Sequence, residues 1–236
     1  MALSGNAFLA IWHDIDPASQ NDYMEWHTRE HMPERLSVPG FTVGKRLINH
    51  SVERYRYGTI YAGDTVEVFR SPAYLERLNN PTPWSDQVQP SFRNFLRVAC
   101  EHVASAGVGD GGAIATIRLN LANRDQTADW QKAAQALADK LLQITAACSV
   151  SIGLARPEVS GVKTRETELR PGMNEPEFDA VVLIEGSGEP ELQASLTAFE
   201  AAIADSRCGL VHPASIVYHL AYQLTADNLR GTRSNP

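Results

Sequence analysis

The residues best able to do chemistry are concentrated in one stretch, from residue 23 to residue 41. His27 and His31 stand four residues apart, so on a helix they lie one turn apart on the same face. Glu30 and Glu34 repeat that spacing on the neighbouring line of the helix. The same helix carries two large aromatic residues, Tyr23 and Trp26. Because burying such charged groups unpaired is costly, we expect them to pair with other groups or to line a cavity.

Several kinds of site are compatible with this pattern. The segment from His27 to His31 matches the inverted zinc-protease motif, but its third ligand would have to be Glu76, and Pro33 does not suit such proteases. A metal ion or haem iron bound by His27 or His31 is a second interpretation. A third is a metal-free acid/base site in an apolar pocket, in which His31 titrates near neutrality. In a purely structural interpretation, Glu34 pairs with Arg35 and Glu30 with His31, and these pairs close the end of the helix.

The elements that must hold this helix follow from the apolar pattern. Residues 7–15 predict a strand, and Asp16-Pro17 fits an N-cap followed by proline at the first helical position. We expect the helix to run from about Pro17 to Met32. It should break or kink at Pro33, whose ring clashes with the preceding turn. Further strands are predicted at residues 41–50, 55–63 and 92–103.

The second half of the chain repeats this order of elements. Strands are predicted at residues 113–121, 150–155, 178–185 and 216–224, and helices at residues 126–144 and from residue 189. Both halves follow the order strand–helix–strand–strand–helix–strand of a ferredoxin-like unit. The predicted fold class is therefore α+β. It is a tandem duplication of a ferredoxin-like βαββαβ unit, with two antiparallel sheets packed as an intramolecular α+β barrel.

The corresponding domain boundaries place the site in the first half. We predict a first ferredoxin-like repeat at 1–105, a Gly-rich linker at 106–112, a structural second repeat at 113–226 and a flexible tail at 227–236. The first helix of the second repeat carries alanine and leucine where the first repeat carries histidine and glutamate. That contrast assigns the chemistry to the first repeat. The long polar hairpin at 156–177 is expected to be mobile.

Helix and strand geometry predicts neighbours for the two histidines. His27 lies about ten residues into the predicted helix, or roughly 15 Å along it. A helix that returns antiparallel to the first strand would place His31 near the start of that strand, too far from His13 to contact it. The fourth strand should end at the same place, so Glu101 and His102 are the expected neighbours of His31. Which of these two faces the helix stays open.

Composition excludes several classes of partner. The net charge of −7 argues against a nucleic-acid or anionic-membrane surface, because phosphate binding depends on clustered lysine and arginine. The sequence has no basic, apolar leader and no apolar run of membrane-spanning length. Its three cysteines are scattered, which suits a reducing compartment. We therefore predict a cytoplasmic protein with no nucleic-acid or membrane partner.

The first hundred residues resemble a known superfamily. The residues that carry the resemblance are Trp26, Glu30-His31, Pro33-Glu34-Arg35-Leu36, Val38-Pro39-Gly40-Phe41 and Arg46. With these residues the chain resembles the ferredoxin-like dimeric α+β-barrel proteins, and within them the EthD-like group. The resemblance implies a ligand cleft of the kind used by cofactor-free monooxygenases, lactone isomerases, cyclases and haem-binding relatives. It also implies either a homodimer or a monomer in which the second repeat forms an internal pseudo-dimer.

These observations together predict a small-molecule enzyme. It would isomerise, cyclise or oxygenate a small, partly aromatic metabolite at an acid/base site centred on His31, with no cofactor. The alternative is a non-catalytic accessory protein that binds a ligand, a metal or haem, with His27 or His31 as the ligand to iron. The predicted catalytic residues are His31, Glu30 and Glu101, with no metal ligands. The predicted ligand-binding residues are Trp26, His27, Tyr23, His102 and Arg46.

Overall fold

The structure, a computed structural model, describes residues 3–121, 127–170, 178–206 and 210–232. Eight antiparallel strands form a closed barrel in the order β1-β3-β2-β8-β5-β7-β6-β4. The chain divides into two compact units, each built from segments of both halves of the sequence. Strands β4 (Phe92–Gly107) and β8 (Leu210–Thr225) contribute residues to both units. The α+β class and the barrel are therefore as predicted, whereas the boundaries of the two repeats stay a prediction.

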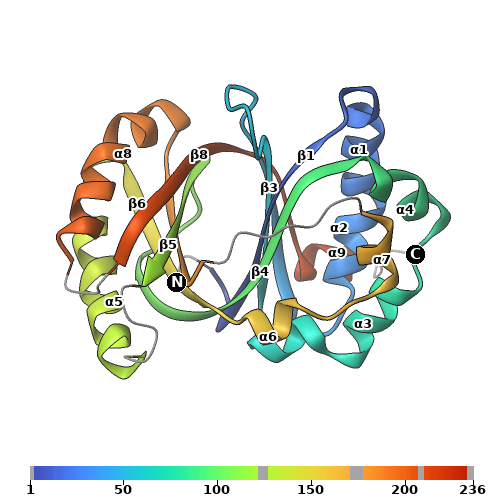
Figure 1. Cartoon of the computed structure of the whole chain (residues 1–236), viewed down its shortest axis with the longest axis horizontal. Helices are drawn as coiled ribbons and strands as arrows, with labels where there is room; N and C mark the ends of the chain where they lie inside the picture. Colours follow the sequence, from blue (N-terminus) through green and yellow to red (C-terminus); the bar gives the residue numbers. More distant parts are fainter. Residues whose placement is uncertain (1–2, 122–126, 171–177, 207–209, 233–236) are drawn as a thin grey trace. The chain divides into compact units, whose positions relative to one another are not determined.

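Unit 1 comprises residues 1–4, 100–155 and 177–220. Its central strands are β5 (Ala113–Leu121), β6 (Ala147–Ala155) and β7 (Ala180–Gly186), and β7 pairs with the other two. Helices α5 (Thr127–Leu142) and α8 (Glu189–Ala204) lie side by side on this sheet (Figure 1). Their buried residues are almost entirely apolar and include Leu137 and Phe199. The structural role predicted for this part of the sequence stays a prediction.

Unit 2 comprises residues 5–99, 156–176 and 221–236. Strand β3 (Tyr57–Gly63) lies between β1 (Ala7–Ile15) and β2 (Phe41–Ile48), with which it pairs antiparallel. Its helical elements also include η1 (Pro17–Ser19), η3 (Val66–Arg70), α3 (Pro72–Asn79), α4 (Pro83–Val88) and η4 (Gln89–Ser91). Ser71 and Thr82 cap α3 and α4 by accepting hydrogen bonds from backbone N–H groups.

The predicted site helix is continuous through Pro33 but changes its geometry before it. It consists of α1 (Gln20–Trp26), a π-helical turn η2 (His27–His31) and α2 (Met32–Leu36). In the π-helical turn the Met32 N–H donates to the His27 carbonyl, five residues back. Because Pro33 has no N–H and its ring clashes with the carbonyl four residues earlier, a widened turn accommodates it without ending the helix. The expected distortion is present, and the helix ends at Leu36.

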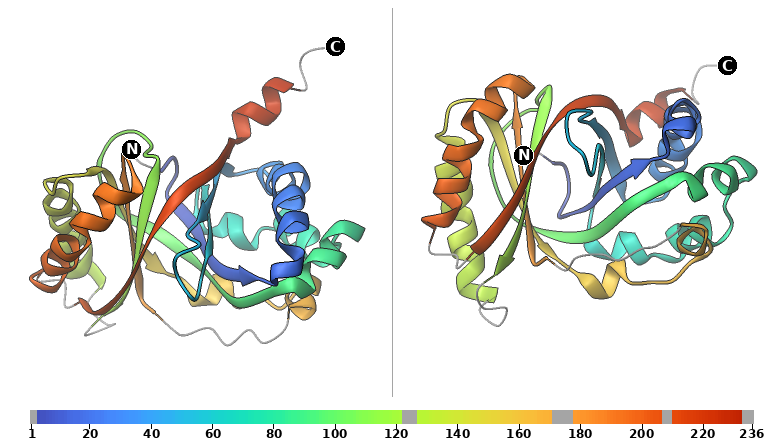
Figure 2. Two further views of the ribbon diagram at one scale, coloured as in Figure 1. Left: turned by 90° about the horizontal axis from the view of Figure 1, so that it is seen from above. Right: turned by 45° about the horizontal axis from the view of Figure 1, so that its top comes forward.

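Two predicted flexible regions form regular structure instead. Within the 156–170 segment, α6 (Pro157–Ser160) and α7 (Arg165–Leu169) are helical, so the expectation of a mobile hairpin is wrong for these residues. The start of the predicted C-terminal tail forms α9 (Ala226–Thr232), which contacts α2 and β2 (Figure 2). Residues 171–177 and 233–236 lie outside the described residues, as does Cys208. Among the described residues, no helix is long and apolar enough to cross a membrane.

Candidate functional site

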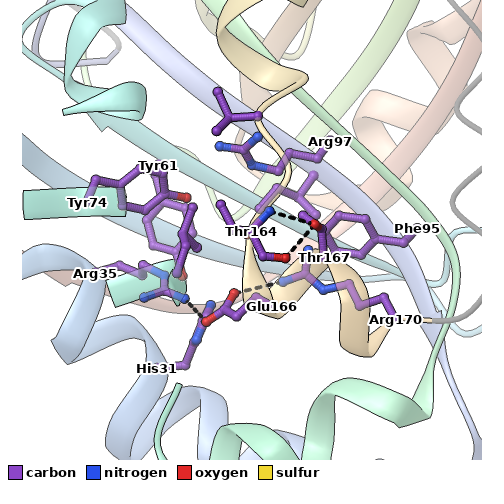
Figure 3. A pocket seen from close by; sticks show the side chains of 13 residues that line it. His31, Arg35, Tyr61, Tyr74, Phe95, Arg97, Thr164, Glu166, Thr167 and Arg170 are labelled. Atoms are coloured by element: carbon purple, nitrogen blue, oxygen red, sulfur yellow. Dashed lines mark hydrogen bonds and ion pairs between the residues drawn. The ribbon is translucent and has the colours of Figure 1, made fainter. Parts of the chain in front are cut away.

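The site consists of two adjoining cavities in unit 2. The first, which we call the arginine cavity, has a volume of about 30 Å³ and opens to solvent (Figure 3). It is lined by residues of the site helix, β1, β3, α3, β4 and the 156–170 segment: Ile11, His31, Arg35, Tyr61, Tyr74, Leu78, Phe95, Arg97, Val162, Thr164, Glu166, Thr167 and Arg170. The second, the histidine cavity, has a volume of about 20 Å³ and is lined by Ile11, His13, His27, His31, Thr59, Tyr61, Phe92, Phe95 and Arg170. His31 and Tyr61 are common to both, so the cavity expected beside His27 and His31 is present.

An ion-pair network closes one side of the arginine cavity. Glu166 receives a hydrogen bond from Arg35 and another from Arg170, the latter at 3.0 Å between Nη2 and Oε2. The side chains of Arg35 and Glu166 are only 2% and 1% exposed. Burial alone would lower the pKa of Arg35, but Glu166 and neighbouring groups raise it above its ordinary value. Burial lowers the pKa of Arg170 to about 10, although Glu166 opposes that shift.

The arginine cavity carries an excess of positive charge. Its lining includes three guanidinium groups and one carboxylate. Arg97 donates from Nη1 to the Ser160 carbonyl at 3.0 Å and lies 5.9 Å from the centre of the Tyr74 ring. Among the described residues, no carboxylate forms an ion pair with Arg97. A guanidinium that lacks a counter-ion at an open cavity favours an anionic ligand.

Three neutral imidazoles surround the histidine cavity. Burial lowers the pKa of His13 to about 3 and the pKa values of His27 and His31 well below their usual value. Nearby cations act in the same direction, chiefly Arg46 on His27 and Arg35 on His31. The expectation that His31 titrates near neutrality is therefore wrong, because burial first and the Arg35 cation second both lower its pKa. All three imidazole rings are therefore uncharged at neutral pH.

His13 belongs to this group, contrary to the sequence-based geometry. Its Nε2 lies 3.2 Å from the Tyr23 hydroxyl, and it lines the same cavity as His27 and His31. The helix begins at Gln20 rather than Pro17, since residues 17–19 form a 3₁₀ turn. His27 therefore lies seven residues into the helix, or roughly 10 Å along it. The same distance along β1, counted back from Ile15, spans about three residues. That offset brings the histidines beside Ile11 and His13.

The predicted residues on the site helix occupy different surroundings. Trp26 is buried and donates from Nε1 to Ser85 Oγ at 3.2 Å. Its ring is tilted by 33° against that of His31, with 4.2 Å between the ring centres. Glu30 accepts a hydrogen bond from the Thr82 hydroxyl, so its carboxylate anchors the start of α4. Neither side chain is among those that line the two cavities.

Three predicted residues lie on strands. Arg46 donates from Nη1 to Thr28 Oγ1 at 2.7 Å and to the Met24 carbonyl at 3.2 Å, which fixes its guanidinium against α1 and η2. Glu101 and His102 belong to unit 1, where they pair with Leu154 and Gly153 of β6. Neither is among the residues that line the cavities around His31.

Several site residues were missed by sequence reasoning. Glu166 and Arg170 come from the segment expected to be a mobile hairpin, and Arg97, Tyr61 and Thr59 from strands without a distinctive pattern. One local signal was present. Glu166 and Arg170 are four residues apart, the spacing of a helical ion pair, and Thr164 begins a capping box with Thr167.

The cavities also limit what the site can hold. Among the described residues, no group of three or more histidine, cysteine, aspartate or glutamate side chains is placed to bind a metal ion. Cavities of about 30 and 20 Å³ hold water-sized molecules, whereas cofactor and drug-sized ligands occupy pockets of roughly 300–1,000 Å³. A haem group does not fit these two cavities in their present shape.

Comparison with solved structures identifies the fold. An anthrone oxidase-like protein superposes with a TM-score of 0.64 at 11% sequence identity, over 96% of each chain. A proposed monooxygenase of Fusobacterium nucleatum gives 0.58 at 7% identity, over 94% of this chain and 96% of that one. A mutant chlorite dismutase of Candidatus Nitrospira defluvii gives 0.54 at 8% identity, over 98% and 97%. The chain has the ferredoxin-like α+β-barrel fold.

The α+β-barrel fold agrees with the superfamily resemblance of the first hundred residues. No protein-family model matches the sequence, and no curated protein matches it significantly. These three structural neighbours are 7–11% identical to the chain, so they show its fold and not its activity. The narrower EthD-like assignment stays a prediction.

Proposed function

We propose that the chain is a small-molecule enzyme that removes a proton from an acidic, partly aromatic metabolite and stabilises the resulting anion without a cofactor. One observation carries the proposal: neutral His31 lies at the junction of two cavities whose lining includes three guanidinium groups and one carboxylate. A general base must be unprotonated at the working pH, and His31 meets that condition. Fixed guanidinium groups stabilise negative charge that develops beside them.

The low pKa of His31 suits a reaction that creates an anion next to it. In the free cavity, burial and Arg35 disfavour the imidazolium. When a substrate C–H or O–H gives its proton to His31, the bonding electron pair stays on the substrate as an anion. That anion supplies the missing counter-charge and so raises the pKa of His31 within the complex. Arg97 and Arg170 are placed to stabilise the same anion.

Three reaction types follow from one such anion. Return of the proton to a different atom completes an isomerisation, and attack by the anion on an internal electrophile completes a cyclisation. In oxygenation, the anion gives its electron pair to dissolved O₂, a C–O bond forms and the peroxide takes up the proton held by His31; loss of water from the hydroperoxide then leaves one oxygen atom on the product. The last agrees with the monooxygenase named among the structural neighbours. Tyr74 and Phe95 supply aromatic walls, and because the arginine cavity is open to solvent, only the reactive end of a substrate has to enter it.

The other roles predicted from sequence are part of this proposal. His27 positions the ligand, Trp26 packs against His31, and Tyr23 and Arg46 support the helix that carries the histidines. Glu30 orients this helix through Thr82. Roles for Glu101 and His102, an EthD-like relationship, a cytoplasmic location and a homodimer or pseudo-dimer are retained as predictions.

A non-catalytic binding protein is the second candidate. It is favoured by the small volume of both cavities, which would suit the passive retention of a small ligand. Deuterium exchange separates the two candidates. The protein would be incubated in D₂O with acetylacetone or resorcinol, and loss of the acidic C–H signal followed by proton NMR. We expect exchange faster than in buffer with the wild-type protein and at the buffer rate with His31→Gln. Binding of either probe without faster exchange would support the binding protein and overturn the enzyme.

A further inference from the structure

The arginine cavity contains one positive charge that no neighbouring carboxylate neutralises. Arg35 is paired with Glu34 at 3.1 Å and with Glu166. Arg170 shares Glu166 at 3.0 Å. Three guanidinium groups are therefore set against two carboxylates, and within the described part of the chain Arg97 has no acidic partner. A monovalent anion beside Arg97 would balance the charge of this cluster.

The Arg97 guanidinium is held in place by neutral groups. Its Nη1 donates to the Ser160 carbonyl at 3.0 Å, and its central carbon lies 5.9 Å from the centre of the Tyr74 ring. Ser160 is itself fixed to β4, because the Ala99 N–H donates to its Oγ at 2.7 Å. These contacts orient the guanidinium without compensating its charge. An arginine has five N–H groups, so others are left to donate to a ligand.

A second group that lines this cavity lacks a partner. Tyr61 is 1% exposed, and over the residues that the structure describes its hydroxyl has no hydrogen-bond partner. Its side chain lines the same cavity as Arg97 (Figure 3). Burial raises the pKa of Tyr61, so the phenol keeps its proton at neutral pH and can donate it. Because an unpaired buried donor costs free energy, this hydroxyl favours a ligand that accepts a hydrogen bond.

The volume of the cavity limits the part of a ligand that can enter it. A volume of about 30 Å³ has room for roughly two to three water-sized atoms, since one buried water needs about 10–15 Å³. A carboxylate group consists of one carbon and two oxygen atoms, so it is of this size. Its oxygens match the fork of a guanidinium and accept a hydrogen bond from a phenol. Phosphate and sulfate bring four oxygen atoms, more than this volume holds.

Apolar side chains lie at the mouth of the cavity. Val162 lines the cavity, which opens to solvent, and is 37% exposed. Among the described residues, Val108 and Val162 are the large apolar residues that are exposed. Leu78 of α3 and Phe95 of β4 line the same cavity. An apolar or aromatic body attached to the carboxylate would therefore contact Val162 and stay outside the small interior volume.

We propose that the arginine cavity binds the carboxylate of a monocarboxylic acid, with Arg97 as its counter-ion and Tyr61 as a hydrogen-bond donor. The body of the acid is apolar or aromatic and lies against Val162. That this acid is the substrate rests on the proposed function, whereas its binding depends on the cavity alone. The carboxylate enters already ionised, so the proton that His31 receives in the proposed reaction comes from another group of the same molecule.

Calorimetric titration of the full chain with benzoate and with benzamide tests the need for a carboxylate. The two compounds have nearly the same shape, and only benzoate is charged. We expect benzoate to bind at least about tenfold more tightly than benzamide. Formate, a carboxylate without a body, should displace benzoate but bind more weakly. Equal affinity for benzoate and benzamide, or no binding of benzoate at millimolar concentration, would overturn the inference. Formate that binds as tightly as benzoate would overturn the apolar body.

Two substitutions locate the site. Arg97→Gln and Tyr61→Phe should each weaken benzoate binding about tenfold, because each removes a donor to a charged group. Arg93→Gln is the matched control, because Arg93 lies on the same strand, pairs with Asp16 and does not line the cavity. It should leave the affinity unchanged. Tyr61→Phe keeps the buried ring, so it still tests the site if Arg97→Gln does not fold. Unchanged affinity in both variants would overturn the inference.

Benzoate has no acidic C–H group, so its binding is independent of the proposed reaction. His31→Gln should abolish deuterium exchange and keep the affinity for benzoate within about twofold, since the neutral ring is not the counter-ion. Benzoate binding without deuterium exchange in the wild-type protein would contradict the proposed enzyme and support the carboxylate site. Deuterium exchange without benzoate binding would do the opposite, so the two failures are distinguishable.

Discussion

Mild acid should destabilise this protein, because its three cavity histidines are buried in their neutral form. An unfolded histidine binds a proton below a pKa of about 6.5, whereas the folded pKa is about 3 for His13 and well below 6.5 for His27 and His31. Below pH 6.5 the unfolded state therefore binds more protons than the folded state. Stability is fully present above pH 6.5 and is lost as the pH falls.

The size of the effect follows from linkage. One pH unit corresponds to about 1.4 kcal/mol for each group that is protonated only when unfolded. Between pH 7.5 and pH 5, His13, whose folded pKa is about 3, should cost about 2 kcal/mol of a total stability of roughly 5–15 kcal/mol. His27 and His31 change the stability in the same direction. Glu34 acts in the opposite direction, because burial raises the pKa of its carboxyl and the folded state gains that proton first.

Urea unfolding measured at several pH values between 7.5 and 5 would check this prediction. We expect the free energy of unfolding to fall increasingly steeply below pH 6.5. His13→Phe should remove about 2 kcal/mol of that fall. A phenyl ring is suited to the position, since His13 already packs against Tyr57 and Phe92. His50→Gln makes a comparable change at an exposed position and serves as the control. A free energy of unfolding that stays constant from pH 7.5 to pH 5 would refute the reasoning.

Four further predictions concern single side chains. Glu166→Gln removes the carboxylate that two buried guanidinium groups share, leaving Arg35 paired with Glu34 alone, and should cost about 3–5 kcal/mol in urea unfolding, whereas Glu168→Gln, in an exposed pair, should change stability by no more than about 0.5 kcal/mol. Arg97→Gln should weaken binding of benzoate about tenfold, or about 1.4 kcal/mol, in calorimetric titration, and equal affinity would contradict an anion site there. His31→Gln should lower the melting temperature by only a few degrees while abolishing deuterium exchange; a large loss of stability would instead indicate a structural role. Asp14→Ala removes the acceptor of three hydrogen bonds and should cost more than about 2 kcal/mol, measured by thermal unfolding.

Much of the fold could be predicted because buried strands have a strong local signature. The predicted limits of β1 (Ala7–Ile15) and β5 (Ala113–Leu121) coincide with the observed ones. Both strands are apolar runs bounded by turn residues, so the signal and the element have the same ends. β4 and β8 extend to 16 residues each, longer than predicted. The extra residues of β4 are small, and the added start of β8 contains His212 and Pro213, which interrupt the apolar pattern of the sequence. Cross-strand pairing rather than local pattern determines where these strands end.

The site was only partly predictable, for a physical reason. The spacing of His27 and His31 is a local property, and it indicated the correct helix. The partner of Arg35 is Glu166, 131 residues away in sequence, and no periodicity relates two such positions. Only the folded chain brings the 156–170 segment against the site helix within unit 2. The excess positive charge of the arginine cavity therefore could not be derived from a sequence whose net charge is negative.

Pro33 connects the local and the tertiary parts of this site. Its missing N–H and its ring disrupt an ordinary helical turn, and the chain responds with the π-helical turn at His27–His31. Such a turn costs regular hydrogen bonding, so it persists only where the surrounding structure stabilises it. Here Thr59 contacts one end of the turn at His27, and Trp26 packs on His31 at the other. Pro33, which predicts a break in the helix, therefore accounts for the π-helical turn that carries His27 and His31. Both of these histidines line the cavities of the site.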